Sequence, residues 1–180
     1  MSVQLFILGQ LMESDTYPYE LKKKLSEPIP LDRFGGITES KLYYHFESLE
    51  KKGFVARTEV VKEENRPDKQ LFRITEQGRH SLPKQIYSLF ERSEDIQGMI
   101  VGLSNLHHVD TDQVIAILQK KIDKINTDWQ EITQYRNHPI DSVEELRLFL
   151  DSYLVSHHEH KITWLENLIH WLKTGGYPNE

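Results

Sequence analysis

The chain has 180 residues, of which 38% are hydrophobic and 28% are charged, a balance that predicts a folded, soluble protein rather than a disordered one. It contains no cysteine, which excludes disulfides, thiolate nucleophiles and thiolate metal ligands, and its net charge of −6 does not by itself favour a nucleic-acid partner. No apolar stretch has membrane-spanning length and no basic leader precedes the first apolar segment, so we expect a cytoplasmic protein without a membrane partner.

The charge is distributed unevenly along the chain. Residues 1–90 carry 14 Lys and Arg against 13 Asp and Glu, whereas residues 91–180 carry 8 against 15. The acidic excess therefore belongs to the second half, and any phosphate binding by the first half must come from local basic patches.

Two short amphipathic helices are predicted at the amino terminus. The first spans residues 3–12 and the second about residues 17–26, where Pro18 suits the first helical position. The second helix directs the run Lys22–Lys24 away from its apolar side, as a contact to a DNA backbone or as a merely solvated face. Prolines and glycines between residues 28 and 36 then predict a loop.

The stretch from Thr38 to Thr75 has the pattern of a helix followed by a β-hairpin. Thr38 suits an N-cap position and Gly53 suits the position that ends a helix. Between them an apolar stripe recurs at three- and four-residue steps: Leu42, Phe46 and Leu49. The positions off this stripe carry groups that can donate, accept or stack: Glu39, Ser40, Lys41, Tyr43, Tyr44 and His45.

Two segments rich in β-forming residues follow the helix, at residues 54–61 and 71–75, and a charged loop joins them. Helix, strand, loop and strand form the second half of a winged helix-turn-helix, in which the helix start and the wing approach DNA. We therefore predict these DNA-binding residues: Thr38, Glu39, Ser40, Lys41, Tyr43, Tyr44, His45, Arg66, Lys69 and Lys22. An ordinary amphipathic helix with a solvated face, beside a neutral exposed turn, is the alternative.

The rest of the chain is predicted to be helical. We expect four helices with these approximate bounds: 75–90, 95–106, 111–136 and 142–173. Thr75, Asp110 or Thr111, and Ser142 are the expected N-caps. In the last helix the apolar positions between Tyr153 and Leu172 cover more than one face, which requires partners on several sides. A second copy of the same segment is the expected partner, and the chain's own amino-terminal helices are the alternative.

These elements predict a mainly α fold with a small β-hairpin. Residues 1–91 would form a winged helix-turn-helix DNA-binding domain, and residues 92–180 would form an antiparallel helical dimerisation domain.

Five segments carry a resemblance to one protein family: residues 7–11, 17–21, 40–55, 69–78 and 164–166. Over nearly its whole length the chain resembles the PadR-type transcriptional regulators, in particular those with a longer helical tail. Pro18 replaces a usual glycine, and Tyr44 stands where proline is common. The resemblance implies a homodimer that binds an inverted-repeat operator in double-stranded DNA, usually as a repressor. For some members it also implies release by small aromatic effectors such as phenolic acids.

Side chains of the second half could line a pocket for such an effector: Trp129, Tyr153, His157 and Trp164. Aromatic residues at helical spacing more often belong to a core or an interface, which is the interpretation we favour. His157 and His160 are three residues apart and could share a metal ion, but surface histidines usually do not, so no metal is predicted.

The sequence predicts neither an enzyme nor a cofactor. It contains no nucleophile elbow and no phosphate-binding glycine loop, and its neighbouring carboxylates do not face each other. The alternative function is a winged-helix module that binds another protein without binding DNA, to which the acidic balance gives some weight.

Overall fold

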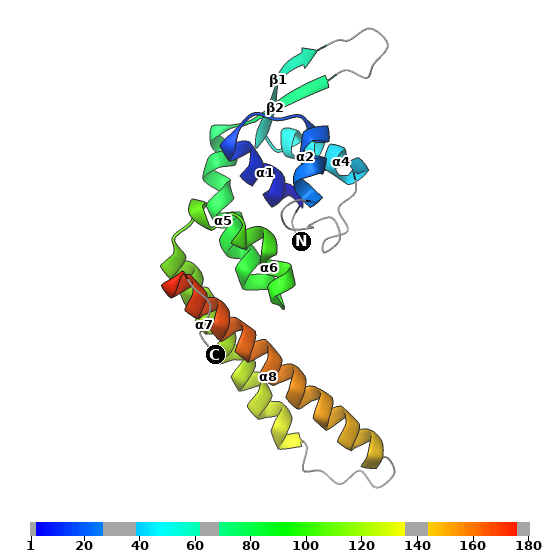
Figure 1. Cartoon of the computed structure of the whole chain (residues 1–180), viewed down its shortest axis with the longest axis vertical. Coiled ribbons are helices and arrows are strands. Elements are labelled where there is room, and N and C mark those ends of the chain that lie inside the picture. The colour runs from blue at the N-terminus through cyan, green and yellow to red at the C-terminus, as the bar shows by residue number, and fades with distance from the viewer. Residues whose placement is uncertain (1–2, 27–38, 62–68, 136–143, 176–180) are drawn as a thin grey trace. The chain divides into compact units, whose positions relative to one another are not determined.

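The structure, a computed structural model, describes residues 3–26, 39–61, 69–135 and 144–175. It consists of two compact units, Met1–Val109 and Asp110–Glu180. The first unit contains the following elements, labelled in Figure 1: α1 (Val3–Glu13), α2 (Pro18–Ser26), α4 (Glu39–Lys51), β1 (Val55–Val61), β2 (Lys69–Ile74), α5 (Glu76–Arg92), α6 (Ile96–Leu103) and η1 (Leu106–His108). The second unit contains α7 (Thr111–Tyr135) and α8 (Glu144–Thr174).

The helices of the first unit enclose an apolar interior. Its largest fully buried side chains come from α1, α2, α4 and α5: Leu5, Ile7, Leu8, Leu11, Leu21, Leu25, Leu42, Phe46, Leu49, Leu82, Ile86 and Phe90. The apolar stripe predicted between residues 42 and 49 is therefore confirmed. Gly53 ends α4 with a positive φ of 75°, and the N–H of Phe54 donates to the carbonyl of Leu49 at 2.9 Å. This is the helix end that a glycine permits without strain.

β1 and β2 form an antiparallel hairpin that extends beyond the helices of this unit (Figure 1). Its pairing runs from Val55 opposite Ile74 to Val61 opposite Lys69, with one irregularity in β1. Such bulges bend a strand and increase its twist.

Phe72 of β2 attaches the hairpin to the helices in two ways. Its backbone N–H and carbonyl exchange hydrogen bonds with Thr16, each at 3.1 Å, so the segment between α1 and α2 acts as a third strand at this point. Its ring lies 4.7 Å from the ring of Phe46 in α4, and both side chains are buried. Aromatic pairs at this separation add to the stabilisation from burial.

α5 begins at the predicted cap. The hydroxyl of Thr75 accepts a hydrogen bond from the N–H of Gly78 at 3.0 Å and donates one to the carbonyl of Gly53 at 2.7 Å. A Cβ at Gly78 would collide with the backbone carbonyl of Phe54. Glycine at this position therefore allows α5 to start directly against the end of α4.

In the second unit α7 and α8 lie side by side and run antiparallel (Figure 1). Asp110 caps α7, because its carboxylate accepts a hydrogen bond from the N–H of Asp112 at 2.9 Å. The buried side chains come from the first half of α7 and the end of α8: Val114, Leu118, Ile122, Leu165, Leu168 and Ile169. Toward the connection between the helices burial is lost, and Ile132 is 44% exposed and Phe149 is 66% exposed.

The predicted fold class is thus confirmed, with local differences. The helix expected over residues 95–106 ends at Leu103, and η1 follows it after a short turn. Thr38, Ser142 and the loop at residues 28–36 lie outside the described residues. The first compact unit reaches Val109 because α6 packs on α1 and α5, while the division of roles between residues 1–91 and 92–180 stays a prediction. Among the described helices, none combines the length and the apolar character that crossing a membrane requires.

Candidate nucleic-acid interface and the exposed face of α8

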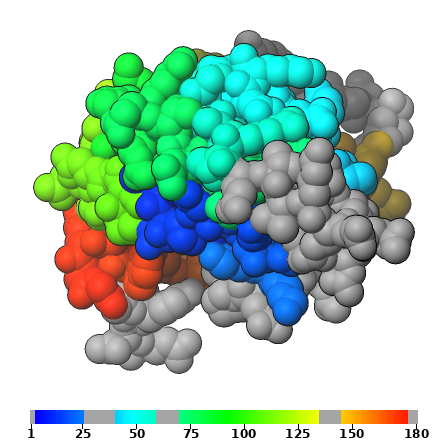
Figure 2. All heavy atoms as spheres, turned by 90° about the horizontal axis from the view of Figure 1, so that it is seen from above, coloured from blue at the N-terminus to red at the C-terminus, as the bar shows by residue number. Residues whose placement is uncertain are grey.

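α4 buries one face and presents the other. Leu42, Phe46 and Leu49 are at most 1% exposed, whereas Tyr43 is 46% exposed and Tyr44 is 67% exposed. Ser40 and Lys41 in the first turn are also exposed. In the space-filling view of Figure 2 the segment coloured cyan, which includes α4 and β1, lies on the surface. Four of the predicted DNA-binding side chains of α4 therefore lie outward: Ser40, Lys41, Tyr43 and Tyr44.

His45 lies at the edge of this exposed face. Its ring is half-buried and lies 5.3 Å from the ring of Tyr44, in an edge-on arrangement. Its Nδ1 is buried without a hydrogen-bond partner among the described residues. Burial, together with the positive charges of Lys52 and Lys41, lowers the pKa of His45. The neutral imidazole is therefore the favoured form beside these lysines.

α4 is held at its carboxyl-terminal half by α1. The side-chain amide of Gln4 donates to the hydroxyl of Ser48 at 3.1 Å and accepts from the ammonium group of Lys52 at 3.0 Å. One amide thus uses both of its polar atoms at the carboxyl-terminal end of α4. Such two-point contacts restrict sliding of one helix along the other.

Two ion pairs fix the base of the wing. Arg57 of β1 pairs with Glu50 of α4 at 2.8 Å, and its guanidinium lies 5.6 Å from the centre of the Phe72 ring. Arg73 of β2 pairs with Asp15 at 2.7 Å, and the hydrogen bond and charge of that carboxylate raise the pKa of Arg73. The first pair joins the wing to α4, so the helix and the wing form one surface.

The other predicted DNA-binding residues lie at the start of α4, on α2, at the start of β2, or outside the described residues. Glu39 is the first residue of α4, and Lys22 lies exposed on α2, which packs against α4. Lys69 is the first residue of β2 and pairs with Val61 through its backbone. Thr38 and Arg66 lie outside the described residues.

α8 presents an exposed row of large side chains, which we name the α8 seam. Its members follow one another in alternating steps of four and three residues, with a gap at Asn167: Leu146, Leu150, Tyr153, His157, His160, Trp164 and Trp171. All of them are exposed, and Tyr153 is 56% exposed. This spacing is the heptad period of helices that pack on a second helix. The seam is separate from the row that contacts α7, whose buried members are Leu165, Leu168 and Ile169.

The four predicted effector-binding residues lie in three separate aromatic–histidine pairs, one of which joins Tyr153 and His157. Trp129 stacks on His158, with ring centres 4.5 Å apart, and Tyr153 stacks on His157 at 5.7 Å. Trp164 has its ring centre 6.2 Å from that of His160. Each histidine of the run 157–160 is thus directed to a different aromatic ring. His158 is a partner that the sequence analysis did not identify, because only the packing of α8 on α7 brings it to Trp129.

The comparisons with known proteins give one family match. Residues 7–84 match the family described as "Transcriptional regulator PadR-like family". The chain is similar to the structure of a transcriptional regulator from Clostridium thermocellum, Cth-833, at 30% identity over 48% of this chain and 78% of that one, with a TM-score of 0.40. Comparison with curated proteins found no match.

Two further solved structures resemble most of the chain. One is Bacillus subtilis PadR in complex with operator DNA, at 13% identity over 94% of this chain and 98% of that one, with a TM-score of 0.41. The other is the PadR-like transcriptional regulator BC1756 from Bacillus cereus, at 20% identity over 94% of each chain, with a TM-score of 0.39.

Proposed function

Because this chain belongs to the transcriptional regulator PadR-like family, we propose that it is a homodimer that binds an inverted-repeat operator through α4 and represses transcription there. The observation that carries this proposal is the division of α4 into a buried stripe and an outward face with Ser40, Lys41, Tyr43 and Tyr44. The first turn of a helix presents free N–H groups and a positive dipole, which favour a phosphate.

The outward groups of α4 have complementary tasks in this proposal. Lys41 neutralises a phosphate, which supplies affinity without sequence preference. Tyr43 and Tyr44 contact base edges or thymine methyl groups further along the groove, which supplies specificity. Lys22, Glu39, His45 and Lys69 are proposed to contribute around them, together with Thr38 and Arg66.

The α8 seam supports the dimer. Leu146, Leu150, Tyr153 and Trp164 expose large apolar surfaces at heptad spacing, and a helix with such a second row is stabilised by a second helix. A two-fold partner would supply the same row from a second copy of α8. We propose that residues 92–180 serve this assembly while residues 1–91 contact DNA.

A salt titration of DNA binding tests the proposal. Fluorescence anisotropy with the DNA upstream of the chain's own gene would be compared for the wild-type chain and for Lys41→Ala. We expect Lys41→Ala to weaken binding to all sequences and to reduce the slope of log K against log salt by about 1. Lys84→Ala, at an exposed lysine of α5, makes the same charge change elsewhere in the unit and should leave the slope unchanged.

Two results would contradict the proposal. If Lys41→Ala and Lys84→Ala give the same slope, Lys41 is not a phosphate ligand. If the wild-type chain shows no salt-sensitive binding at micromolar concentration, the protein is a winged-helix module for a protein partner instead.

We further propose that a small aromatic compound of the phenolic acid class releases the operator. Stacking surfaces are available at the candidate residues, since Tyr153 and Trp164 are exposed and Trp129 is half-buried. Three of the four candidates lie on the α8 seam, so the compound would bind where the second copy is proposed to pack. Titration of phenolic acids into the DNA complex should release DNA and quench tryptophan fluorescence. Release that persists in Trp164→Ala and Tyr153→Ala would place the effector elsewhere.

A further inference from the structure

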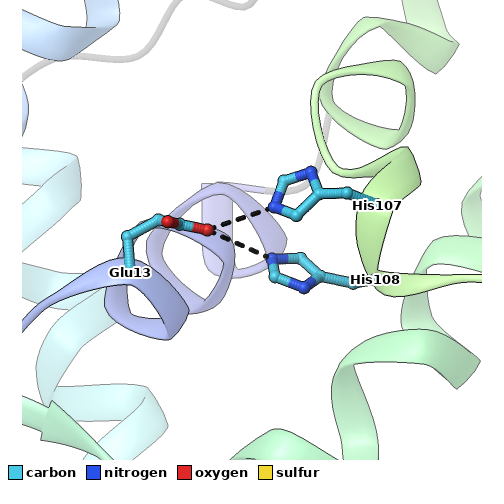
Figure 3. A group of neighbouring side chains, drawn as sticks. All are labelled: Glu13, His107 and His108. Atoms are coloured by element: carbon cyan, nitrogen blue, oxygen red, sulfur yellow. Dashed lines mark hydrogen bonds and ion pairs between the residues drawn. The ribbon is translucent and has the colours of Figure 1, made fainter.

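Three side chains from two distant segments of the sequence converge in the first unit. Glu13 is the last residue of α1, and His107 and His108 belong to η1 (Figure 3). The Nε2 atoms of both histidines point toward the same carboxylate oxygen of Glu13, at 3.1 Å for His107 and 3.9 Å for His108. The two imidazole rings lie side by side, with centres 3.8 Å apart. All three candidate ligand atoms lie within 4.8 Å of one another.

The backbone around η1 holds this arrangement in place. Asn105 is buried and donates from its side-chain amide to the carbonyl of Val101 at 2.7 Å. Its side chain lies directly against Gly9 of α1, where a Cβ would collide with it. The N–H of His108 donates to the carbonyl of Asn105 at 3.1 Å. η1 therefore starts directly after Asn105, which packs on Gly9. Gly9 lies four residues, or about one helical turn, before Glu13 in α1.

His108 has a polar atom that the protein leaves unsatisfied. Its Nε2 is buried and has no hydrogen-bond partner among the described residues, since 3.9 Å to Glu13 is too long for a hydrogen bond. A buried polar atom without a partner costs free energy and calls for a ligand or another explanation. The His108 side chain is 11% exposed, while His107 and Glu13 are 59% and 60% exposed, so solvent reaches the group from one side.

We propose that Glu13, His107 and His108 bind a divalent transition metal ion, with zinc as the best match. Two imidazoles and one carboxylate are a common zinc donor set, which leaves a fourth position for water. Ligand atoms at zinc bond lengths in a tetrahedron are about 3.3 Å apart. The two nitrogen-to-oxygen distances of 3.1 and 3.9 Å lie on either side of that value, so small rotations of the side chains accommodate the ion.

The contact between His107 and Glu13 has the atoms that a metal site needs. A carboxylate can only accept a hydrogen bond, so the Nε2 of His107 donates to Glu13 at 3.1 Å. A metal ion at this position would take the place of that proton.

An ion at this position would connect the end of α1 to the last turn of the first unit. α1 packs on α4, α5 and α6, so it is central to that unit. An ion that binds only the folded unit stabilises it by mass action. The expected role is a clamp that holds η1, the last turn before Val109, against α1.

Zinc titration of the full chain after treatment with a chelator tests this inference. Isothermal titration calorimetry should give one zinc ion per chain, and zinc should raise the melting temperature. His107→Gln/His108→Gln removes two ligands, and Glu13→Gln removes one at an exposed position where the fold should be retained. We expect the affinity to fall at least about tenfold in each, with the rise in melting temperature lost. Circular dichroism without metal checks that the variants are folded.

A matched control is available at two exposed histidines outside this group and outside the α8 seam. His80→Gln/His170→Gln also removes two histidines, and zinc binding by this variant should equal that of the wild-type chain. Zinc binding that is lost in this control but kept in the His107/His108 variant would overturn the inference. So would a wild-type chain that binds no zinc at micromolar concentration, or one whose affinity is unchanged in Glu13→Gln and in the double variant.

Discussion

The two units differ in how completely they bury their own apolar side chains. In the first, Leu42, Phe46 and Phe72 are at most 2% exposed, and the helices and the hairpin close around them. In the second, Phe149 is 66% exposed and Tyr153 is 56% exposed. The first unit is therefore specified by contacts within the chain, whereas we propose that the exposed large side chains of the second unit contact a second chain.

A substitution in the closed core gives the largest effect. Phe46→Ala removes a buried ring that lies 4.7 Å from Phe72, and we expect a loss of about 3–5 kcal/mol in the free energy of unfolding of the first unit. Chemical denaturation followed by circular dichroism measures it. The matched control is Phe149→Ala on α8, which should change the unfolding free energy of the isolated chain by less than about 0.5 kcal/mol. Equal effects would remove the distinction between the two units.

Charges on the α8 seam should give the next largest effect. Leu150→Glu/Tyr153→Glu places carboxylates in the proposed interface, so we expect a monomer and a loss of roughly 100-fold in operator affinity, because both half-sites can no longer be bound together. Sedimentation and anisotropy measure the two quantities.

Ser152→Glu/Ser156→Glu is the control for the seam variant. Both serines are exposed and neither belongs to the seam, so this variant adds the same charges outside it. A dimer that tolerates glutamate at positions 150 and 153 as well as at 152 and 156 would show that the seam is not the interface.

A smaller loss is expected at the junction between the wing and α5. Thr75→Ala removes the cap of α5 and the hydrogen bond to Gly53, which should cost about 1 kcal/mol. Thermal unfolding of Thr75→Ser, which keeps the hydroxyl, should lie close to that of the wild-type chain. If Thr75→Ala and Thr75→Ser have equal thermal stability, the cap contributes nothing to the stability of the first unit.

The smallest effect concerns the pH dependence of the first unit. The pKa of His45 is lowered in the folded chain by burial and by Lys52 and Lys41, so below about pH 6.5 the unfolded chain binds more protons at this residue. Stability should therefore fall as pH decreases from 6.5 toward the folded pKa, and His45→Gln should make this decline shallower. Unfolding free energies between pH 7 and pH 5 measure it. His170→Gln, at an exposed residue of α8, should leave the decline unchanged, and a His45→Gln curve that coincides with it would contradict the assignment.

Local features of the fold could be predicted from the sequence. The buried stripe of α4, the end of α4 at Gly53 and the cap at Thr75 depend on residues within one or two helical turns of each other. Their spacing is therefore visible along the chain. The same holds for the outward position of Tyr43 and Tyr44, which follows from the stripe that they flank.

Features that depend on distant residues could not be predicted in this way. Glu13 and His107 are 94 positions apart, and the packing of α6 and Asn105 on α1 brings them together. The backbone bridge between Thr16 and Phe72 likewise joins two segments without any shared pattern. The sequence predicted that the apolar positions of α8 cover more than one face. Which of them pack on α7 and which stay exposed could be assigned only from the position of α7.

The oligomeric state of the full chain is the most direct test of the claim that α8 is built to pack on a second copy. Sedimentation velocity at micromolar concentration should give a species with the mass of two chains of 21.3 kDa each. In that species Trp164 and Trp171 should be protected from acrylamide quenching, although each is more than a third exposed in the single chain. A species with the mass of one chain and freely quenched tryptophans would contradict the account.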